Sequence, residues 1–136
     1  MTIQLTVIGL SKIGVSIGLA LKDQKEKIIR VGHDRDQSNH SKVKELNAFD
    51  QTPGKINSAV EDADIIILAV PLDEIKDTIE YISPLLKPGA VLMDTSPIKI
   101  GISKIVEQFL PEDRYFVSFQ PTINPKYLHE TSNSLE

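Results

Sequence analysis

Short apolar runs alternate with segments of helical period along most of the 136 residues. The clearest run, residues 64–70, lacks polar alternation, which is typical of a strand covered on both faces in a parallel sheet. Strand–helix alternation of this kind predicts parallel strands with helices on both faces. The expected strands are 3–8, 28–32, 64–70, 90–93 and 115–119, with a weak one near 48–49. The expected helices are 12–23, 37–47, 72–86 and 98–109, and residues 57–62 are expected to form a short helix or a turn.

The length allows one domain. We therefore expect a single α/β domain with a doubly wound, mostly parallel sheet of the Rossmann type over residues 1–122. The polar residues 123–136 are expected to form a tail, which could begin a linker to a helical domain.

Composition excludes several classes of protein. The chain has 15 basic and 19 acidic residues, and the excess of acidic residues lies in residues 71–136. Neither half therefore has the basic excess of a nucleic-acid binder. Because Cys is absent, we expect no disulfide, no thiolate metal site and a cytoplasmic location. No His, Asp or Glu cluster has metal-ligand spacing, so no metal is expected. The apolar first 21 residues contain Gln4, Ser11 and Lys12 and have no basic residue before Lys12, which argues against a membrane span or a signal peptide.

A glycine motif lies between the first expected strand and the first expected helix. It reads Gly9-x-Ser11-x-x-Gly14, a variant of the dinucleotide-binding fingerprint. The first Gly makes a tight turn, the last permits close packing, and the helix N-terminus offers N–H groups to a pyrophosphate. Ser11 replaces the middle Gly, where its Cβ narrows the approach and its hydroxyl could donate a hydrogen bond. We expect Lys12 and Ile13 to share in this cofactor-binding loop.

An acidic residue ends the second expected strand. Asp34 follows Gly14 by 20 residues, the spacing of a carboxylate that binds the adenosine ribose, and it favours NAD over NADP. Arg35 keeps NADP possible, because it could bind a 2′-phosphate, stack on adenine or be a solvated surface charge. The alternative interpretation is that Gly9 and Gly14 serve only in a turn and in packing, with Asp34 as a surface or capping residue.

Further candidates lie at the other strand ends, where ligands bind in such sheets. Val70 and Pro71 could contact the nicotinamide ribose, although Pro71 equally suits the first position of a helix. Thr95 or Ser96 could contact the nicotinamide or a substrate, or cap a helix. The other polar residues are expected to take no part in catalysis. We expect His33 near the adenosine end, His40 on a helix surface, His129 in the tail, and Asp73, Glu74 and Asp77 at a solvated helix start.

These residues resemble the nucleotide-binding domain of prephenate and arogenate dehydrogenases. The resemblance covers about residues 3–122 and rests on six segments: 7–16, 32–35, 63–71, 86–90, 94–99 and 116–117. It implies a Rossmann-type fold and an NAD or NADP cofactor. It also implies hydride transfer from a cyclohexadienol substrate to nicotinamide, coupled to decarboxylation, in tyrosine biosynthesis. Family members usually dimerise through a second, helical domain, so a dimer is expected only if such a domain exists.

The resemblance also assigns catalytic positions. The family's catalytic His, which precedes a Pro, corresponds to Gln120 before Pro121, and its Ser corresponds to Pro97, with Ser96 one residue away. The catalytic candidates are therefore Gln120 and Ser96, although Gln cannot titrate and so cannot be a general base. Two alternatives stay open: a catalytically silent nucleotide-binding or regulatory module, and a related dehydrogenase acting on another small substrate.

Overall fold

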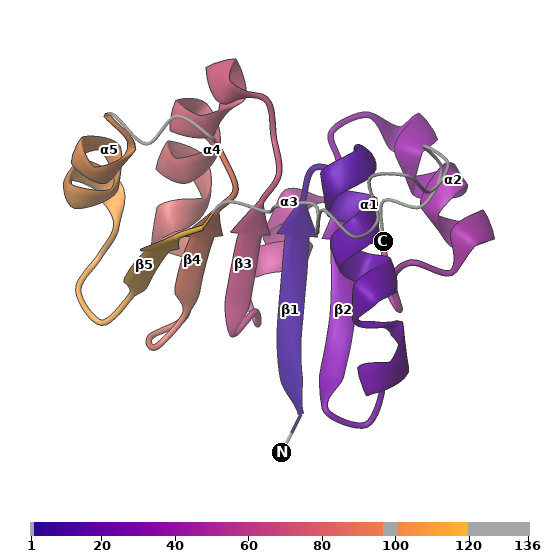
Figure 1. The fold of residues 1–136 in the computed structure, drawn as a ribbon. Helices are drawn as coiled ribbons and strands as arrows, with labels where there is room; N and C mark the ends of the chain where they lie inside the picture. Colours follow the sequence, from indigo (N-terminus) through magenta and orange to yellow (C-terminus); the bar gives the residue numbers. More distant parts are fainter. Residues whose placement is uncertain (1, 97–100, 120–136) are drawn as a thin grey trace, which may run out of the picture.

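The computed structural model describes residues 2–96 and 101–119. Its described part contains one five-stranded sheet of order β2-β1-β3-β4-β5, in which every pairing is parallel (Figure 1). The expected α/β class is confirmed, and the sheet is parallel throughout rather than mostly parallel. The strands are β1 (Ile3–Ile8), β2 (Ile28–His33), β3 (Ile65–Leu68), β4 (Val91–Asp94) and β5 (Tyr115–Ser118).

The strand register aligns the carboxyl ends of the sheet. Ile8 lies opposite both His33 and Leu68, Leu68 lies opposite Asp94, and Asp94 lies opposite Ser118. The loops that follow the strands therefore emerge along one edge. From β1 the chain goes first to β2 on one side and then to β3 on the other, so the direction of winding reverses at β1. Ligands bind at such a reversal in doubly wound sheets.

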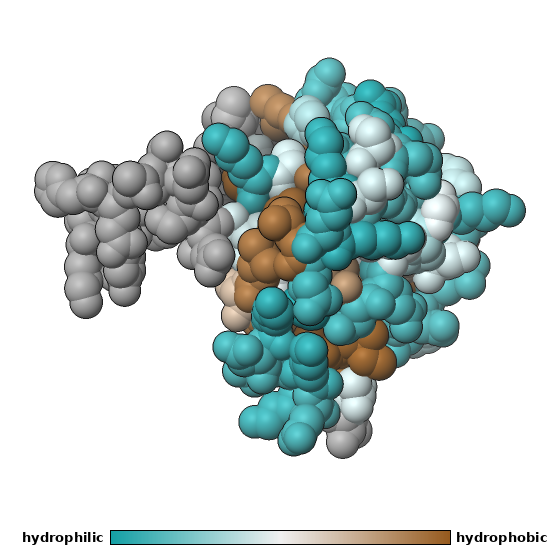
Figure 2. All heavy atoms as spheres, turned by 90° about the vertical axis from the view of Figure 1, so that its right-hand side faces the viewer, coloured by the Kyte–Doolittle hydropathy of each residue, from teal (hydrophilic) through white to brown (hydrophobic). Residues whose placement is uncertain are grey.

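Helices cover both faces of the sheet (Figure 1). One core joins the sheet to residues of α3, α4 and α5, and a second joins it to residues of α1 and α2. The predicted apolar stripe is confirmed in α4, which buries Ile75, Ile79 and Ile82. Figure 2 shows that the side formed by α2 and the β2 edge is mostly hydrophilic, with smaller apolar areas. The helices are α1 (Lys12–Ala20), α2 (Gln37–Leu46), α3 (Ile56–Val60), α4 (Ile75–Ile82) and α5 (Ile102–Phe109), with 3-10 turns at η1 (Lys22–Gln24), η2 (Leu72–Glu74) and η3 (Ser83–Leu85).

The weak strand expected near residues 48–49 is wrong. Ala48 and Phe49 are buried but lie in a loop, and β-type pairing beside β2 is reduced to a bridge between Val31 and Gln51. The apolar character that suggested a strand reflects burial alone, since Phe49 packs into the core shared with α1 and α2.

A buried arginine holds this loop in position, although no strand forms there. The guanidinium of Arg30, fully buried on β2, donates to the carbonyls of Gly18 and Ala48, each at 2.9 Å, and pairs with Asp50 at 3.2 Å. Burial acts to raise the pKa of Asp50, but the hydrogen bonds and charge of Arg30 outweigh it and hold that pKa below its ordinary value. The loop after α2 is thus tied to both α1 and β2.

Some expected boundaries shift. The helix expected over 12–23 ends at Ala20 and continues as a turn and η1, and the helix expected over 72–86 divides into η2, α4 and η3. Within the described residues, the helix expected over 98–109 spans Ile102–Phe109. Pro97, Gln120 and the tail 123–136 lie outside the described residues.

Candidate functional site

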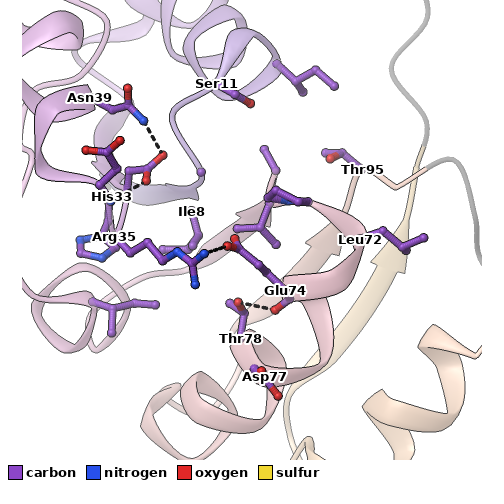
Figure 3. Close-up of a pocket in the computed structure, with 18 of the residues that line it drawn as sticks. Ile8, Ser11, His33, Arg35, Asn39, Leu72, Glu74, Asp77, Thr78 and Thr95 are labelled. Atoms are coloured by element: carbon purple, nitrogen blue, oxygen red, sulfur yellow. Dashed lines mark hydrogen bonds and ion pairs between the residues drawn. The ribbon is translucent and has the colours of Figure 1, made fainter.

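A cavity of about 980 Å³ lies at the carboxyl end of the sheet, around the ends of β1, β2, β3 and β4 (Figure 3). It brings together most of the candidate site residues, since its lining includes Gly9, Ser11, Ile13, Asp34, Arg35, Val70, Pro71 and Ser96. Two other candidates are placed differently: Lys12 is exposed outside the lining, and Gly14 is buried beneath the loop. The cavity volume suits a small organic ligand or cofactor.

The glycine loop is tight because two side chains are missing. Gly9 has φ 103°, and a Cβ there would collide with the carbonyl group of Ala69 at the end of β3. A Cβ on Gly14 would collide with the carbonyl oxygen of Gly9, so α1 starts directly against the turn. The turn and packing roles of both glycines are therefore present, and they bring the start of α1 to the cavity.

Ser11 lies at the N-cap of α1 without acting as a side-chain cap. Its backbone is extended, and its side chain makes no capping hydrogen bond while lining the cavity. The first N–H groups of a helix have no partner inside the helix, and they carry partial positive charge. The start of α1 can therefore donate hydrogen bonds to an anionic group beside Ser11.

Asp34 is held against the glycine loop rather than turned away from it. The backbone N–H of Leu10 donates to Asp34 Oδ2 at 2.8 Å, and Asn39 Nδ2 donates to the same oxygen at 3.2 Å. Oδ1 accepts from the N–H of Asp36 at 2.8 Å. A carboxylate can accept about four hydrogen bonds, so these three donors leave acceptor capacity for a ligand hydroxyl.

The expectation that His40 lies on a helix surface is wrong. His40 is buried, and its Nε2 lies 2.8 Å from the backbone carbonyl oxygen of Asp34. The ring of His33 stands edge-on to it, with the ring centroids 5.4 Å apart. His33 Nδ1 lies 3.1 Å from the Pro53 carbonyl, which can only accept, so Nδ1 carries hydrogen. Burial lowers the pKa of His33, which favours the neutral ring beneath Asp34.

The end of β4 supplies two buried hydroxyl residues to the cavity. Thr95 Oγ1 donates to the Leu68 carbonyl at 2.8 Å, which fastens this turn to the end of β3. The backbone N–H of Ser96 donates to Asp94 Oδ1 at 3.1 Å. The hydroxyl hydrogen of Thr95 is thus used in a hydrogen bond to the neighbouring strand β3. Gln120, the other catalytic candidate, lies outside the described residues.

Several lining residues were not among the candidates, and three of them carry polar groups that bear on the site: Asn39, Glu74 and Asp77. Asn39 reaches Asp34 from the first turn of α2, and its position five residues after Asp34 was a usable signal. Glu74 and Asp77 were expected at a solvated helix start, and they lie there, with Glu74 half-buried at the end of η2 and Asp77 exposed in the first turn of α4. The sequence did not indicate that both also line the cavity. Glu74 forms an ion pair with Arg35, whereas Asp73 is exposed outside the lining. No sequence signal joins residues 39 positions apart in this way.

Within residues 2–96 and 101–119, no three His, Asp or Glu side chains are grouped so that they could bind a metal ion. The helices in the same ranges are too short or too polar to cross a membrane.

A glycine turn against a helix start, with a carboxylate at the end of the neighbouring strand, defines a nucleotide-binding domain of the Rossmann class. Residues 17–130 match the family model described as the nucleotide-binding domain of prephenate dehydrogenase. Because this match covers most of the chain, the chain belongs to that family.

Two curated proteins similar to this chain agree with the family, and a solved structure agrees with the fold. It is 27% identical over 107 residues to cyclohexadienyl dehydrogenase of Zymomonas mobilis, covering 79% of this chain and 36% of that protein. It is 32% identical over 112 residues to prephenate dehydrogenase of Lactococcus lactis, covering 77% and 29%. The structure of A. aeolicus prephenate dehydrogenase in complex with hydroxyphenyl propionate and NAD+ matches with a TM-score of 0.77 and 19% identity, covering 91% and 44%. The chain therefore spans about a third of the length of these curated relatives.

Proposed function

We propose that this chain binds NAD in the cavity at the carboxyl end of its sheet, as the cofactor domain of a dehydrogenase acting on prephenate or arogenate. The observation that carries the proposal is the hydrogen bond from Leu10 N–H to Asp34, which joins the glycine loop and the ribose-binding candidate into one cavity wall. The names of the similar proteins support the reaction class, and the NAD+ in the A. aeolicus complex supports the cofactor.

In this proposal each wall of the cavity has its own task. The pyrophosphate accepts hydrogen bonds from the first N–H groups of α1 and from the Ser11 hydroxyl, with Gly9 allowing the close approach. The adenosine ribose donates to the carboxylate of Asp34. The nicotinamide ribose lies along Val70 and Pro71. Lys12 is exposed, so its role is limited to long-range attraction of the phosphates.

The charges of the described lining favour NAD over NADP. Arg35 is the one Lys or Arg in that lining, against the carboxylates of Asp34, Asp36, Glu74 and Asp77. A 2′-phosphate would add nearly two negative charges among these groups, whereas a free 2′-hydroxyl adds none.

The catalytic part of the proposal rests on fewer residues. The bound nicotinamide supplies a hydride acceptor, and Ser96 lines the cavity near the end of β4, where its hydroxyl can hydrogen-bond the reacting ring. Gln120 can orient a substrate hydroxyl but cannot remove its proton. The absence of a titrating group at that position favours a second candidate function, a nucleotide-binding module without redox chemistry.

Two measurements test these proposals. Titration with NADH, monitored by nicotinamide fluorescence, should show saturable binding, and no binding at millimolar nucleotide would contradict both functions. Turnover of prephenate or arogenate by the protein in its full-length form, monitored as nicotinamide absorbance, separates the two. Turnover supports the dehydrogenase, while bound NADH without turnover supports the silent module.

A further inference from the structure

An ion pair spans the cavity between two strands that are not neighbours. The guanidinium of Arg35, from the loop after β2, meets the carboxylate of Glu74, at the end of η2 after β3, and both residues line the cavity (Figure 3). The strands β2 and β3 lie on opposite sides of β1. The pair therefore crosses the place where the sheet reverses its winding, beside the ribose-binding candidate Asp34.

The two partners differ in how firmly they are held. The side chain of Arg35 is 81% exposed, whereas that of Glu74 is 23% exposed. The backbone of Glu74 is fixed at both ends, because its N–H donates to Pro71 at 2.9 Å and its carbonyl accepts from Thr78 Oγ1 at 2.7 Å. The guanidinium is thus the partner that can change position when a ligand enters.

Among the cavity residues that the structure describes, Arg35 is also the one cationic group suited to a 2′-phosphate. It stands directly after Asp34, and an Arg in this region is what accommodates the 2′-phosphate of NADP. Among the described lining residues it is the one Lys or Arg, and its guanidinium is already paired with a carboxylate. A 2′-phosphate must therefore compete with Glu74 for the same cation.

We propose that Glu74 is a specificity-determining residue that selects NAD over NADP by holding the Arg35 guanidinium across the cavity. This proposal rests on the proposed binding of NAD. Asp34 disfavours the 2′-phosphate by its own charge, and Glu74 adds a second, separate barrier by occupying the group that would neutralise it. NAD has a neutral 2′-hydroxyl and needs no cation there. The ion pair therefore lowers the affinity for NAD less than it lowers the affinity for NADP.

The test compares the affinities of NADH and NADPH in the same protein, using nicotinamide fluorescence. E74Q removes the carboxylate charge but keeps the side-chain shape, and E80Q is the matched control, because Glu80 is an exposed residue of α4 outside the lining. We expect E74Q to raise the ratio of NADPH to NADH affinity about fivefold, the size of a good exposed ion pair, and E80Q to leave the ratio unchanged.

The same substitution in an R35M background identifies the mechanism. If Glu74 acts mainly by holding Arg35, then most of the E74Q effect on the ratio is lost once the guanidinium is gone, and only the direct repulsion between the Glu74 carboxylate and the 2′-phosphate is left. A gain in R35M as large as the gain in the unmodified background, or an unchanged ratio in E74Q with NADH binding intact, overturns the proposal while leaving NAD binding in place. Failure of the unmodified chain to bind NADH contradicts the proposed function itself.

Discussion

The two ends of the cavity are built in different ways. At the β2 end, Asp34 is fixed by donors from the glycine loop and from α2, and His40 packs beneath it. At the β4 end, Thr95 is fastened to β3 and Ser96 lines the cavity, while the other catalytic candidate, Gln120, lies beyond the described residues. The groups that fix Asp34, at the end proposed to bind adenosine, thus come from one chain segment of about 40 residues, whereas the end proposed to hold the reacting ring draws on later parts of the chain.

This difference explains why nucleotide binding is the better supported half of the proposal. The groups proposed to bind the pyrophosphate and ribose are backbone N–H groups and a carboxylate on fixed elements. Such groups are pre-organised and cost little to order on binding. The proposed chemistry also needs a group that can move a proton, and the candidate that the sequence offers for that role, Gln120, is a glutamine.

The largest expected effect concerns the packing of the glycine loop. G14A places a methyl group against the carbonyl oxygen of Gly9, where backbone must shift to make room. We expect the free energy of unfolding to fall by about 3 kcal/mol and NADH binding to be lost. The matched control is G54A, where the nearest atom to a new Cβ is the Gln37 side chain at 3.9 Å. Urea denaturation measures both variants, and equal stabilities would contradict the packing account.

The next effect tests the adenosine end directly. D34A removes the carboxylate proposed to accept from the ribose, and we expect NADH affinity to fall roughly 10- to 100-fold, the usual range for a hydrogen bond to a charged group. Asp73 is exposed outside the cavity, so D73A controls for the loss of one negative charge. Isothermal calorimetry checks both affinities. Retention of full affinity by D34A would contradict the role given to this residue.

A smaller effect should appear in the dependence of stability on pH. Burial lowers the pKa of His33 from its ordinary value of 6.5, so between the two pKa values the unfolded chain binds more protons than the folded chain. The stability that His33 contributes is therefore complete above pH 6.5 and is lost as the pH falls through the folded pKa. Urea unfolding at about pH 7.5 and about pH 5.5 should show this loss, and H33N should flatten it. An unchanged slope in H33N would assign the loss to other groups.

The smallest effect belongs to the β4 end. S96A removes a neutral hydroxyl, and a neutral hydrogen bond contributes little net free energy, so NADH affinity should change less than about threefold. Turnover by the protein in its full-length form should fall more than NADH affinity does. A loss of NADH affinity as large as that of D34A would remove the contrast between the two ends of the cavity.

Much of the fold could be predicted because its signals are local. Five strands and the apolar stripe of α4 follow from periodicity, and the Gly9–Gly14 motif with Asp34 predicts where a nucleotide belongs. The wrong predictions concern which side chains are buried and which groups they contact in the folded chain. Ala48 and Phe49 are apolar because the core covers them, and Arg30 replaces the missing strand pairing. His40 looks polar in sequence, although its spacing from Val43 by one helical turn indicated a shared buried face.

The sequence by itself determined the alternation of strands and helices, the tight turn at the glycine motif and the carboxylate at the end of the second strand. Each of these features depends on residues that are close together in the sequence. Only the tertiary structure decided that Leu10 would donate to Asp34 and that Arg35 would meet Glu74. These contacts depend on the order of the strands, which places the ends of β2 and β3 on either side of β1 and so brings distant charges into one cavity.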